Sequence, residues 1–251
     1  MSTAEQIIQI RKLNKTYHKA KQPALVNLDL KIGQGEIFGL LGPNGAGKTT
    51  TISILSGLLA PTSGEVVING LNLNKHLDKI KPLIGIVPQE IALYEKLTLR
   101  ENLKFISQIY GLEKENQNSQ INSYLEMLGL LSRANDLVQT YSGGMKRRAN
   151  LIAGILHKPE ILFLDEPTVG VDVHSRAVIL DYIKELNQSG TTIIYTSHYL
   201  EEAEKICTQV AIIDHGRIIS EGKPNDLVGH PDKPANLENL FIELTGRELR
   251  D

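Results

Sequence analysis

Short apolar runs, broken by glycine, asparagine or proline, occupy most of the first seventy residues of the chain. β-branched residues are frequent in these runs, which favours strands over helices. Strands are predicted at IIQIRKL (7–13), ALVNLDLKI (24–32), EIFGLL (36–41) and EVVING (65–70). Asn69-Gly70 lies between two apolar runs, a pattern typical of a hairpin turn. Residues 48–59 have helical spacing and predict a helix that ends at Gly57 or shortly after.

The pattern changes between residues 95 and 157, where apolar positions recur three and four residues apart. We interpret this stretch as a mostly helical insertion. Strand and helix patterns then alternate again: strands at 160–166 and 191–198, helices at 175–190 and 199–207, a hairpin at 209–222 and a last helix at 237–251. The wholly apolar strands favour a parallel sheet covered on both faces. We therefore expect an α/β fold in a single domain over residues 1–251.

Composition excludes several classes of protein. The chain has 251 residues, 27 lysines and arginines, and 29 aspartates and glutamates, so its net charge of −2 gives no basic field for nucleic acid. A single cysteine, Cys207, allows no internal disulfide and fits a reducing compartment, with core packing as its expected role. The N-terminus lacks a signal-peptide pattern, and no apolar run approaches the roughly 20 residues that cross a bilayer. We expect a soluble cytosolic protein that another chain would have to anchor to any membrane.

A phosphate-binding loop is the strongest chemical signal. Four residues separate Gly42 from Gly47, Lys48-Thr49 follows, and the motif lies between a predicted strand and a predicted helix. Backbone N–H groups in such a loop point at phosphate oxygens, a lysine reaches the β and γ phosphates, and a threonine hydroxyl binds Mg²⁺. A glycine-rich turn without function is the alternative, and the strand–loop–helix context disfavours it.

Two adjacent carboxylates, Asp165 and Glu166, end the apolar strand ILFLDE. Neighbouring side chains on a strand point to opposite faces, so the two can serve different purposes. Asp165 is expected to hold Mg²⁺ through water, and Glu166 to orient or deprotonate a water that attacks the γ-phosphate. In isolation this pair would be read as a solvated turn, but the phosphate loop upstream favours the catalytic reading.

Six motifs occur in a characteristic order: GPNGAGKTT, Pro88-Gln89, YSGGM (141–145), ILFLDEP, VGVD (169–172) and the histidine of TSHYLEEAE, His198. In their order and spacing the sequence resembles the ATP-binding subunits of ABC transporters over essentially its whole length. The resemblance implies a P-loop NTPase core of the ABC type, with a mainly parallel sheet and an N-terminal antiparallel β subdomain. It also implies an inserted α-helical subdomain near 95–157 and a C-terminal extension from about 222 to 251.

The resemblance also assigns roles to residues. ATP would be bound by the loop Gly42, Pro43, Asn44, Gly45, Ala46, Gly47, Lys48, Thr49 and Thr50, with Tyr17 stacked on the adenine. Mg²⁺ would be held by Thr49, Gln89 and Asp165. Lys48, Gln89, Glu166 and His198 would be catalytic, with His198 on the γ-phosphate. Tyr17 packing its own hairpin, Gln89 as an ordinary loop residue and His198 as a structural histidine remain the alternatives.

The segment Ser142-Gly143-Gly144 precedes a helix expected to begin near Met145, with Ser142 as its N-cap. The free N–H groups and the helix dipole make this a second anion site. In the family, this signature closes over the γ-phosphate bound by the other subunit, so two chains sandwich two ATP molecules, with Asp172 reaching across. Lys146, Arg147 and Arg148 could add positive potential, although a solvated helical face is the expected role of at least two of them.

The signature departs from the family's commonest form at Tyr141 and Met145, where leucine and glutamine are usual. Met145 with the following cations, and the tail LENLFIELTGR, are similar to the branch that exports drugs, lipids or polysaccharides. The resemblance implies a separate membrane-spanning permease and a second ATP-binding subunit, expected to be an identical chain. It places the protein at the cytoplasmic face of the membrane.

The permease is expected to contact residues 89–99, with Ile91, Leu93 and Tyr94 as apolar anchors. The alternative is that these three side chains pack inward. A non-transport ABC protein acting on ribosomes or DNA is a second functional hypothesis, disfavoured by the single cassette, the absence of a heptad run and the lack of basic surplus. A scaffold with a dead site and a nucleotide kinase explain fewer of the motifs.

Overall fold

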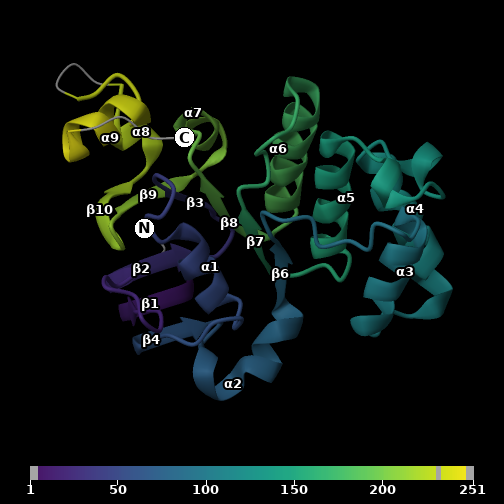
Figure 1. Ribbon diagram of the computed structural model, residues 1–251, viewed down its shortest axis with the longest axis horizontal. Coiled ribbons are helices and arrows are strands. Elements are labelled where there is room, and N and C mark those ends of the chain that lie inside the picture. The colour runs from purple at the N-terminus through teal and green to yellow at the C-terminus, as the bar shows by residue number, and fades with distance from the viewer. Residues whose placement is uncertain (1–4, 230–232, 247–251) are drawn as a thin grey trace.

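A computed structural model describes residues 5–229 and 233–246 of the chain. Two sheets form its framework (Figure 1). The first is antiparallel, in the order β2-β1-β4-β5, from β1 (Gln6–Lys15), β2 (Leu25–Gly33), β4 (Ser63–Ile68) and β5 (Leu71–Asn72). The hairpin predicted at Asn69-Gly70 joins β4 to β5, as expected.

The second sheet has the order β10-β9-β3-β8-β7-β6, and all its pairs are parallel except β9 with β10. Its strands are β3 (Ile37–Leu41), β6 (Ile84–Val87), β7 (Ile161–Asp165), β8 (Thr192–Ser197), β9 (Gln209–Asp214) and β10 (Arg217–Gly222). The expected α/β fold with a mainly parallel sheet and an N-terminal antiparallel sheet is confirmed.

Helices cover the second sheet and extend to one side of it (Figure 1). They are α1 (Lys48–Leu55), α2 (Leu73–Ile80), α3 (Leu99–Ile109), α4 (Lys114–Met127), α5 (Gly143–Ile155), α6 (Val173–Gln188), α7 (Leu200–Ile206), α8 (Pro224–Leu227) and α9 (Leu237–Thr245), with short 3-10 turns at Lys81–Leu83, Leu131–Arg133 and Val138–Thr140. The predicted helical insertion corresponds to α3, α4 and α5. The last residues of the helix predicted at 237–251 lie outside the described residues.

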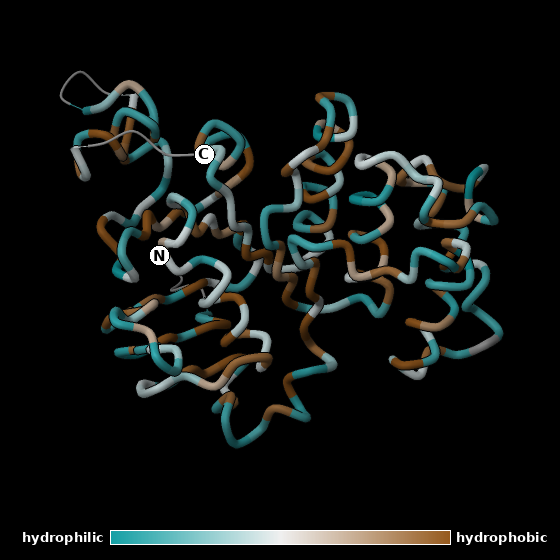
Figure 2. The backbone as a smooth tube through the Cα atoms, in the orientation of Figure 1, coloured by the Kyte–Doolittle hydropathy of each residue, from teal (hydrophilic) through white to brown (hydrophobic). Residues whose placement is uncertain are grey.

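Both faces of the central strands are buried, as the apolar runs predict. Along β7, Leu162 and Leu164 belong to one hydrophobic cluster, whereas Ile161 and Phe163 belong to a second. The first cluster also contains side chains of α3 to α7, and the second is shared with the antiparallel sheet and α1. Figure 2 shows the hydrophobic colour along the strands of both sheets. Among the described residues, none of the helices combines the length and the apolarity that a bilayer crossing requires.

Helix α2 and strand β6 are among the elements that were not predicted. Helix α2 has apolar residues at Leu73, Leu77 and Ile80, but His76 has non-helical backbone angles that interrupt it. Strand β6 is only four residues long and contains Gly85. A Cβ at Gly85 would lie 2.3 Å from the carbonyl oxygen of Gly154 on α5, so glycine allows the helix to pack closely on the strand.

Candidate active site

Four predicted motifs meet at the carboxyl edge of the parallel sheet. The phosphate loop follows β3, Asp165 ends β7, His198 follows β8 and Gln89 follows β6. The order β3-β8-β7-β6 makes these strands neighbours, and their register pairs Leu41 with Ser197. Parallel strands place their carboxyl ends at one edge, which is where open α/β sheets bind ligands. The sheet topology therefore brings together side chains that are more than 150 residues apart in sequence.

The phosphate loop is held against the β9–β10 hairpin. A Cβ at Gly42 would lie 2.1 Å from the Ile213 carbonyl oxygen, and the N–H of Gly216 donates to the Ala46 carbonyl at 2.9 Å. Gly47 has a φ of 115° and is the N-cap of α1, which no side chain caps. The N–H groups of the first turn of α1 thus lack intrahelical partners and are available to an anion.

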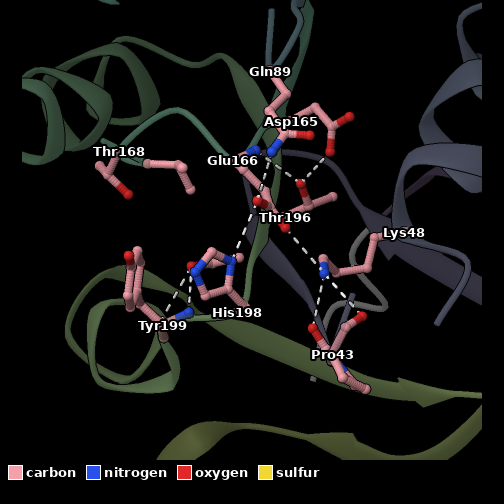
Figure 3. Close-up of polar contacts among 12 residues, drawn as sticks. Pro43, Lys48, Gln89, Asp165, Glu166, Thr168, Thr196, His198 and Tyr199 are labelled. Atoms are coloured by element: carbon pink, nitrogen blue, oxygen red, sulfur yellow. Dashed lines mark hydrogen bonds and ion pairs between the residues drawn. The ribbon is translucent and has the colours of Figure 1, made fainter. Parts of the chain in front are cut away.

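Lys48 is 4% exposed and its ammonium group is surrounded by oxygen atoms. Its Nζ donates to the carbonyl oxygens of Gly42 at 2.8 Å and Pro43 at 3.2 Å, and lies 3.1 Å from Oε1 of Glu166 (Figure 3). Burial of a lysine is costly unless an opposite charge accompanies it. The Glu166 carboxylate supplies that charge.

The Glu166 carboxylate lies at the centre of the predicted catalytic residues (Figure 3). Besides Lys48 at Oε1, its Oε2 accepts a hydrogen bond from Gln89 Nε2 at 3.2 Å and lies 3.3 Å from Nδ1 of His198. That Nδ1 is buried and makes no well-aligned hydrogen bond among the described residues. Three of the predicted catalytic side chains, Lys48, Gln89 and His198, therefore contact the fourth, Glu166, and the Nδ1 of His198 is left for another partner.

Glu166 has a left-handed backbone with φ at 49°, which is uncommon for a residue with a side chain. Such conformations cost about 1–3 kcal/mol and persist where the surroundings impose them. Here the Glu166 N–H donates to Oγ1 of Thr196 at 3.0 Å and to its carbonyl oxygen at 3.2 Å. The turn directs the carboxylate of Glu166 toward Lys48, whereas Asp165 continues the strand.

Thr196 was not among the predicted site residues. It pairs with Asp165 across β7 and β8, and its Oγ1 donates to Asp165 Oδ1 at 2.7 Å. The same hydroxyl accepts from the N–H of Glu166, so one threonine orients both carboxylate residues. Only the strand register could have indicated Thr196, because its sequence context is an ordinary buried strand.

Tyr17 lies at the phosphate loop, with its hydroxyl 3.1 Å from Oγ1 of Thr50. Its ring is 45% exposed, and the Lys15 ammonium lies 5.5 Å from the ring centre. The ring is thus available beside the loop for stacking. Thr49 is exposed at the start of α1, next to Thr50.

The signature begins α5 two residues earlier than predicted. Ser142 caps the helix by accepting from the N–H of Met145 at 3.3 Å, and Ser142 and Gly143 are exposed. Gly144 is buried, and a Cβ there would lie 2.2 Å from Ser175 Oγ and 2.9 Å from Asp172 Oδ2. The close packing of α5 against Asp172 and Ser175 in the same chain is therefore enough to require glycine at position 144. Asp172 caps α6 through the N–H of Ser175 at 2.9 Å, and that hydrogen bond lowers its pKa.

Tyr141 replaces the usual leucine without leaving the core. It is 5% exposed, its ring belongs to the hydrophobic cluster of the helical region, and its hydroxyl donates to the Arg133 carbonyl at 2.7 Å. Burial raises its pKa, with a further contribution from Asp136. The substitution thus keeps an apolar anchor before the signature and adds a hydrogen bond to it.

The three cations after the signature do not form a solvated face, contrary to our expectation. Lys146 pairs with Glu95 at 2.5 Å, and Arg147 donates to the carbonyl oxygens of Gln89 and Val169. Arg148 donates to the Leu128 carbonyl at 2.7 Å. All three are partly buried, because neighbouring loops fold onto the first turns of α5.

The apolar anchors predicted near Gln89 need a similar correction. Leu93 is 9% exposed and Ile91 packs against the core, so both face inward. Tyr94 is 58% exposed, as expected. The rings of Tyr94 and of Phe105 on α3 are nearly perpendicular, with their centres 5.6 Å apart, and Ile109 is 66% exposed one turn later. Near Gln89, exposed apolar side chains are therefore those of Tyr94, Phe105 and Ile109.

A magnesium nucleotide fits the residues at this edge. The uncapped first turn of α1 and buried Lys48 suit phosphate oxygens, and exposed Thr49 and the carboxylate of Asp165 are the hard oxygen ligands that Mg²⁺ prefers. The described residues contain no group of three or more His, Cys, Asp or Glu side chains that could hold a metal alone. That donor set matches Mg²⁺, which usually keeps several waters and binds together with substrate phosphates.

Comparisons with known proteins agree with this geometry. The family model described as ABC transporter matches residues 25–169. Linearmycin resistance ATP-binding protein LnrL of Bacillus subtilis (strain 168) is 48% identical over 221 residues, covering 88% of this chain and 70% of that protein. Nod factor export ATP-binding protein I of Cupriavidus pinatubonensis (strain JMP 134 / LMG 1197) is 33% identical over 303 residues, covering 98% of this chain and 92% of that protein. The dimeric post-hydrolysis structure of the ATP-binding cassette MJ0796 bound to ADP and Pi matches with a TM-score of 0.80 and 28% identity, covering 86% of this chain and 98% of that one.

Proposed function

This chain belongs to the ABC transporter family as an ATP-hydrolysing motor subunit of the exporter type, and from that premise we propose how its residues divide the work. The observation that carries the proposal is the contact of one buried carboxylate, Glu166, with Lys48, Gln89 and His198 beside a phosphate loop. Three of these side chains come from different strand ends, so the sheet itself builds the constellation.

Binding of ATP rearranges the charge pair at the centre of the site. The β and γ phosphates accept hydrogen bonds from the N–H groups of the phosphate loop and from the ammonium of Lys48, while Tyr17 stacks on the adenine. Lys48 then exchanges the Glu166 carboxylate and the loop carbonyls for phosphate oxygens. Thr49, Gln89 and, through water, Asp165 would hold Mg²⁺, which would supply positive charge to neutralise the phosphates.

Hydrolysis uses the carboxylate that Lys48 releases. Glu166 orients a water and accepts its proton as the water oxygen bonds to the γ-phosphorus. The bond from that phosphorus to the bridging oxygen breaks, which yields ADP and phosphate. His198 donates a hydrogen bond to the γ-phosphate and Gln89 holds the water. Burial of Glu166 strengthens these electrostatic interactions, because little solvent screens them.

A second chain completes the site in this proposal. No hydrogen bond among the described residues joins Ser142, Gly143 or Gly144 to the phosphate loop, and Ser142 and Gly143 are exposed at the N-terminus of α5. An exposed helix N-terminus suits the γ-phosphate of an ATP held by another copy. The matching MJ0796 cassette is dimeric, which supports an identical chain as that copy.

The permease is proposed to contact the surface of Tyr94, Phe105 and Ile109, at the inner face of the membrane. Three large apolar side chains exposed on α3 and on the segment that precedes it suit a helix of a membrane partner. After coexpression with its membrane-spanning permease, Ile109→Lys should release the chain from the membrane fraction. Leu58→Lys is the matched control, because Leu58 is 73% exposed away from this surface. Equal retention of both variants on the membrane would refute the assignment.

The cargo is proposed to be a drug-like molecule, a lipid or a polysaccharide. LnrL is named for resistance to linearmycin and the other relative for export of Nod factors, which supports outward transport. A cell that lacks the gene should gain sensitivity to such a compound, and Lys48→Ala should fail to restore resistance. Unchanged sensitivity across those cargo classes would contradict this proposal.

ATP binding and turnover test the central assignment. Lys48→Ala should weaken ATP binding itself, because the loop loses its cation. Glu166→Gln should keep the affinity for ATP and lose hydrolysis by a factor of about 100 or more, since the amide accepts no proton. Unchanged affinity in Lys48→Ala, or normal turnover in Glu166→Gln, would show that the site has been misassigned.

A further inference from the structure

One face of α5 holds the Gln89 loop, which we define as residues 88–98 between β6 and α3. Asn150 of α5 is 1% exposed and lies inside this loop. Its Oδ1 accepts from the N–H of Ala92 at 3.0 Å, and its Nδ2 donates to the carbonyl oxygens of Pro88 at 3.1 Å and Glu90 at 3.5 Å. One buried amide thus satisfies backbone groups on both sides of Gln89.

Arg147 and Lys146 act on the same loop one turn earlier. Arg147 donates through Nη1 to the carbonyl oxygen of Gln89 itself and through Nε to that of Val169 at 3.3 Å. Lys146 pairs with Glu95 further along the loop. Residues three and four apart share a helix face, so Lys146, Arg147 and Asn150 form one continuous contact surface on α5.

The arrangement joins two parts of the proposed site in one rigid element. Helix α5 begins at the exposed signature and packs beside β6, from which the Gln89 loop emerges (Figure 1). Asn150 is eight residues from Ser142, a distance of about 12 Å along a helix axis. A shift of the signature therefore moves the groups that hold the loop, and the Nε2 of Gln89 reaches Glu166 from that loop.

We propose that Asn150 is a positioning residue for Gln89, and that through it the position of the signature helix sets the contact between Gln89 and Glu166. The proposal rests on the catalytic role of Gln89 proposed above. Asn150 touches neither substrate nor the reacting atoms. Its effect passes through the backbone of Pro88, Glu90 and Ala92, and its loss leaves the phosphate loop intact.

Asn102 provides a matched control. It is also a 1% exposed asparagine with three side-chain hydrogen bonds to backbone, to the N–H and carbonyl of Tyr94 and to the Thr98 carbonyl. Loss of either amide should lower stability similarly, because each leaves buried backbone groups without partners. Only Asn150 flanks Gln89, so only Asn150→Ala should disturb the catalytic contact.

The test is a double-mutant cycle on the purified full chain, with steady-state hydrolysis of Mg·ATP as the readout. Asn150→Ala should lower kcat about tenfold, or 1.4 kcal/mol, with KM for ATP within about twofold of the parent value. Asn102→Ala should lose thermal stability to a similar extent and keep kcat within about twofold. In a Gln89→Ala background, Asn150→Ala should reduce kcat little further, because the residue it positions is gone.

Each alternative outcome has a distinct meaning. If Asn150→Ala lowers kcat equally in the parent and in the Gln89→Ala background, or leaves kcat unchanged, Asn150 does not position Gln89. Gln89 itself would still be catalytic. A Gln89→Ala variant with normal kcat would overturn both the proposed function of Gln89 and the inference. If Asn150→Ala does not fold, Asn150→Asp retains the acceptor for Ala92 and turns the donor for two carbonyls into an acceptor, so the same loss of kcat and the same cycle apply.

Discussion

Replacing Thr196 with valine removes one hydroxyl and almost no volume. The residue is fully buried, and that hydroxyl donates to Asp165 Oδ1 at 2.7 Å while accepting from the Glu166 N–H at 3.0 Å. A hydrogen bond to a charged group contributes about 1.5–3 kcal/mol to stability. In the variant, the Glu166 N–H still donates to the backbone carbonyl of residue 196 at 3.2 Å. Losing the hydrogen bond from this N–H to the hydroxyl therefore costs less, about 0.5–1.5 kcal/mol.

The expected destabilisation of Thr196→Val is therefore about 2–4.5 kcal/mol, which lowers Tm by about 4–18 °C in a chain of this size. Catalysis should suffer separately, because both carboxylates lose a group that orients them. We expect kcat for ATP hydrolysis to fall about tenfold to a hundredfold, because small displacements of reacting groups cause losses of this size. Calorimetry and a phosphate-release assay measure the two effects.

Thr192→Val is the control from the same strand. Thr192 is also fully buried, and its hydroxyl accepts from the Gly35 N–H at 2.9 Å, at the opposite end of β8. That substitution should cost about 1–3 kcal/mol of stability and leave kcat unchanged. If Thr196→Val turns over ATP at the parent rate, or if both variants lose kcat equally, the hydroxyl of Thr196 does not organise the site.

Three further predictions concern stability. Tyr141→Phe leaves the Arg133 carbonyl without its partner and should cost about 1 kcal/mol in urea unfolding; an unchanged midpoint would contradict this. Gly144→Ala places a methyl group 2.2 Å from Ser175 Oγ and should lower the free energy of unfolding by about 1–3 kcal/mol in the same assay. An unchanged midpoint would mean that α5 moves away from α6 at no cost. Burial lowers the pKa of His157 in the folded chain, so as pH falls the unfolded chain protonates this histidine first, and stability falls below about pH 6.5. His157→Gln should flatten the dependence of Tm on pH. An identical slope in the variant and the parent would refute this role of His157.

The sequence predicted the residues whose chemistry is tied to a local motif. Lys48 follows a strand and opens a helix, and Asp165 and Glu166 end an apolar strand, so each could be placed on its element before any contact was known. Their convergence also followed from parallel pairing, since adjacent carboxyl ends share an edge. The α/β fold was predictable for the same reason.

Residues that act through tertiary contacts were not predictable. Thr196 and Asn150 occupy ordinary buried positions, and their roles depend on which backbone groups lie opposite. Ile91 and Leu93 looked like exposed anchors because loops are usually at the surface, but the Gln89 loop folds back onto α5 and buries them. Arg147 looked solvated for the converse reason: its guanidinium binds the carbonyl oxygens of two loops that only the fold brings together.

The composite site between two chains is tested most directly by the mass of the Glu166→Gln variant in solution. With ATP and low salt, light scattering should report twice the mass of the monomer, because ATP stays bound between two chains. Adding Ser142→Arg to this variant should restore the monomer at unchanged ATP affinity, since the arginine obstructs the exposed N-terminus of α5. A monomeric Glu166→Gln chain with bound ATP, or a dimer that persists with Ser142→Arg, would contradict the account.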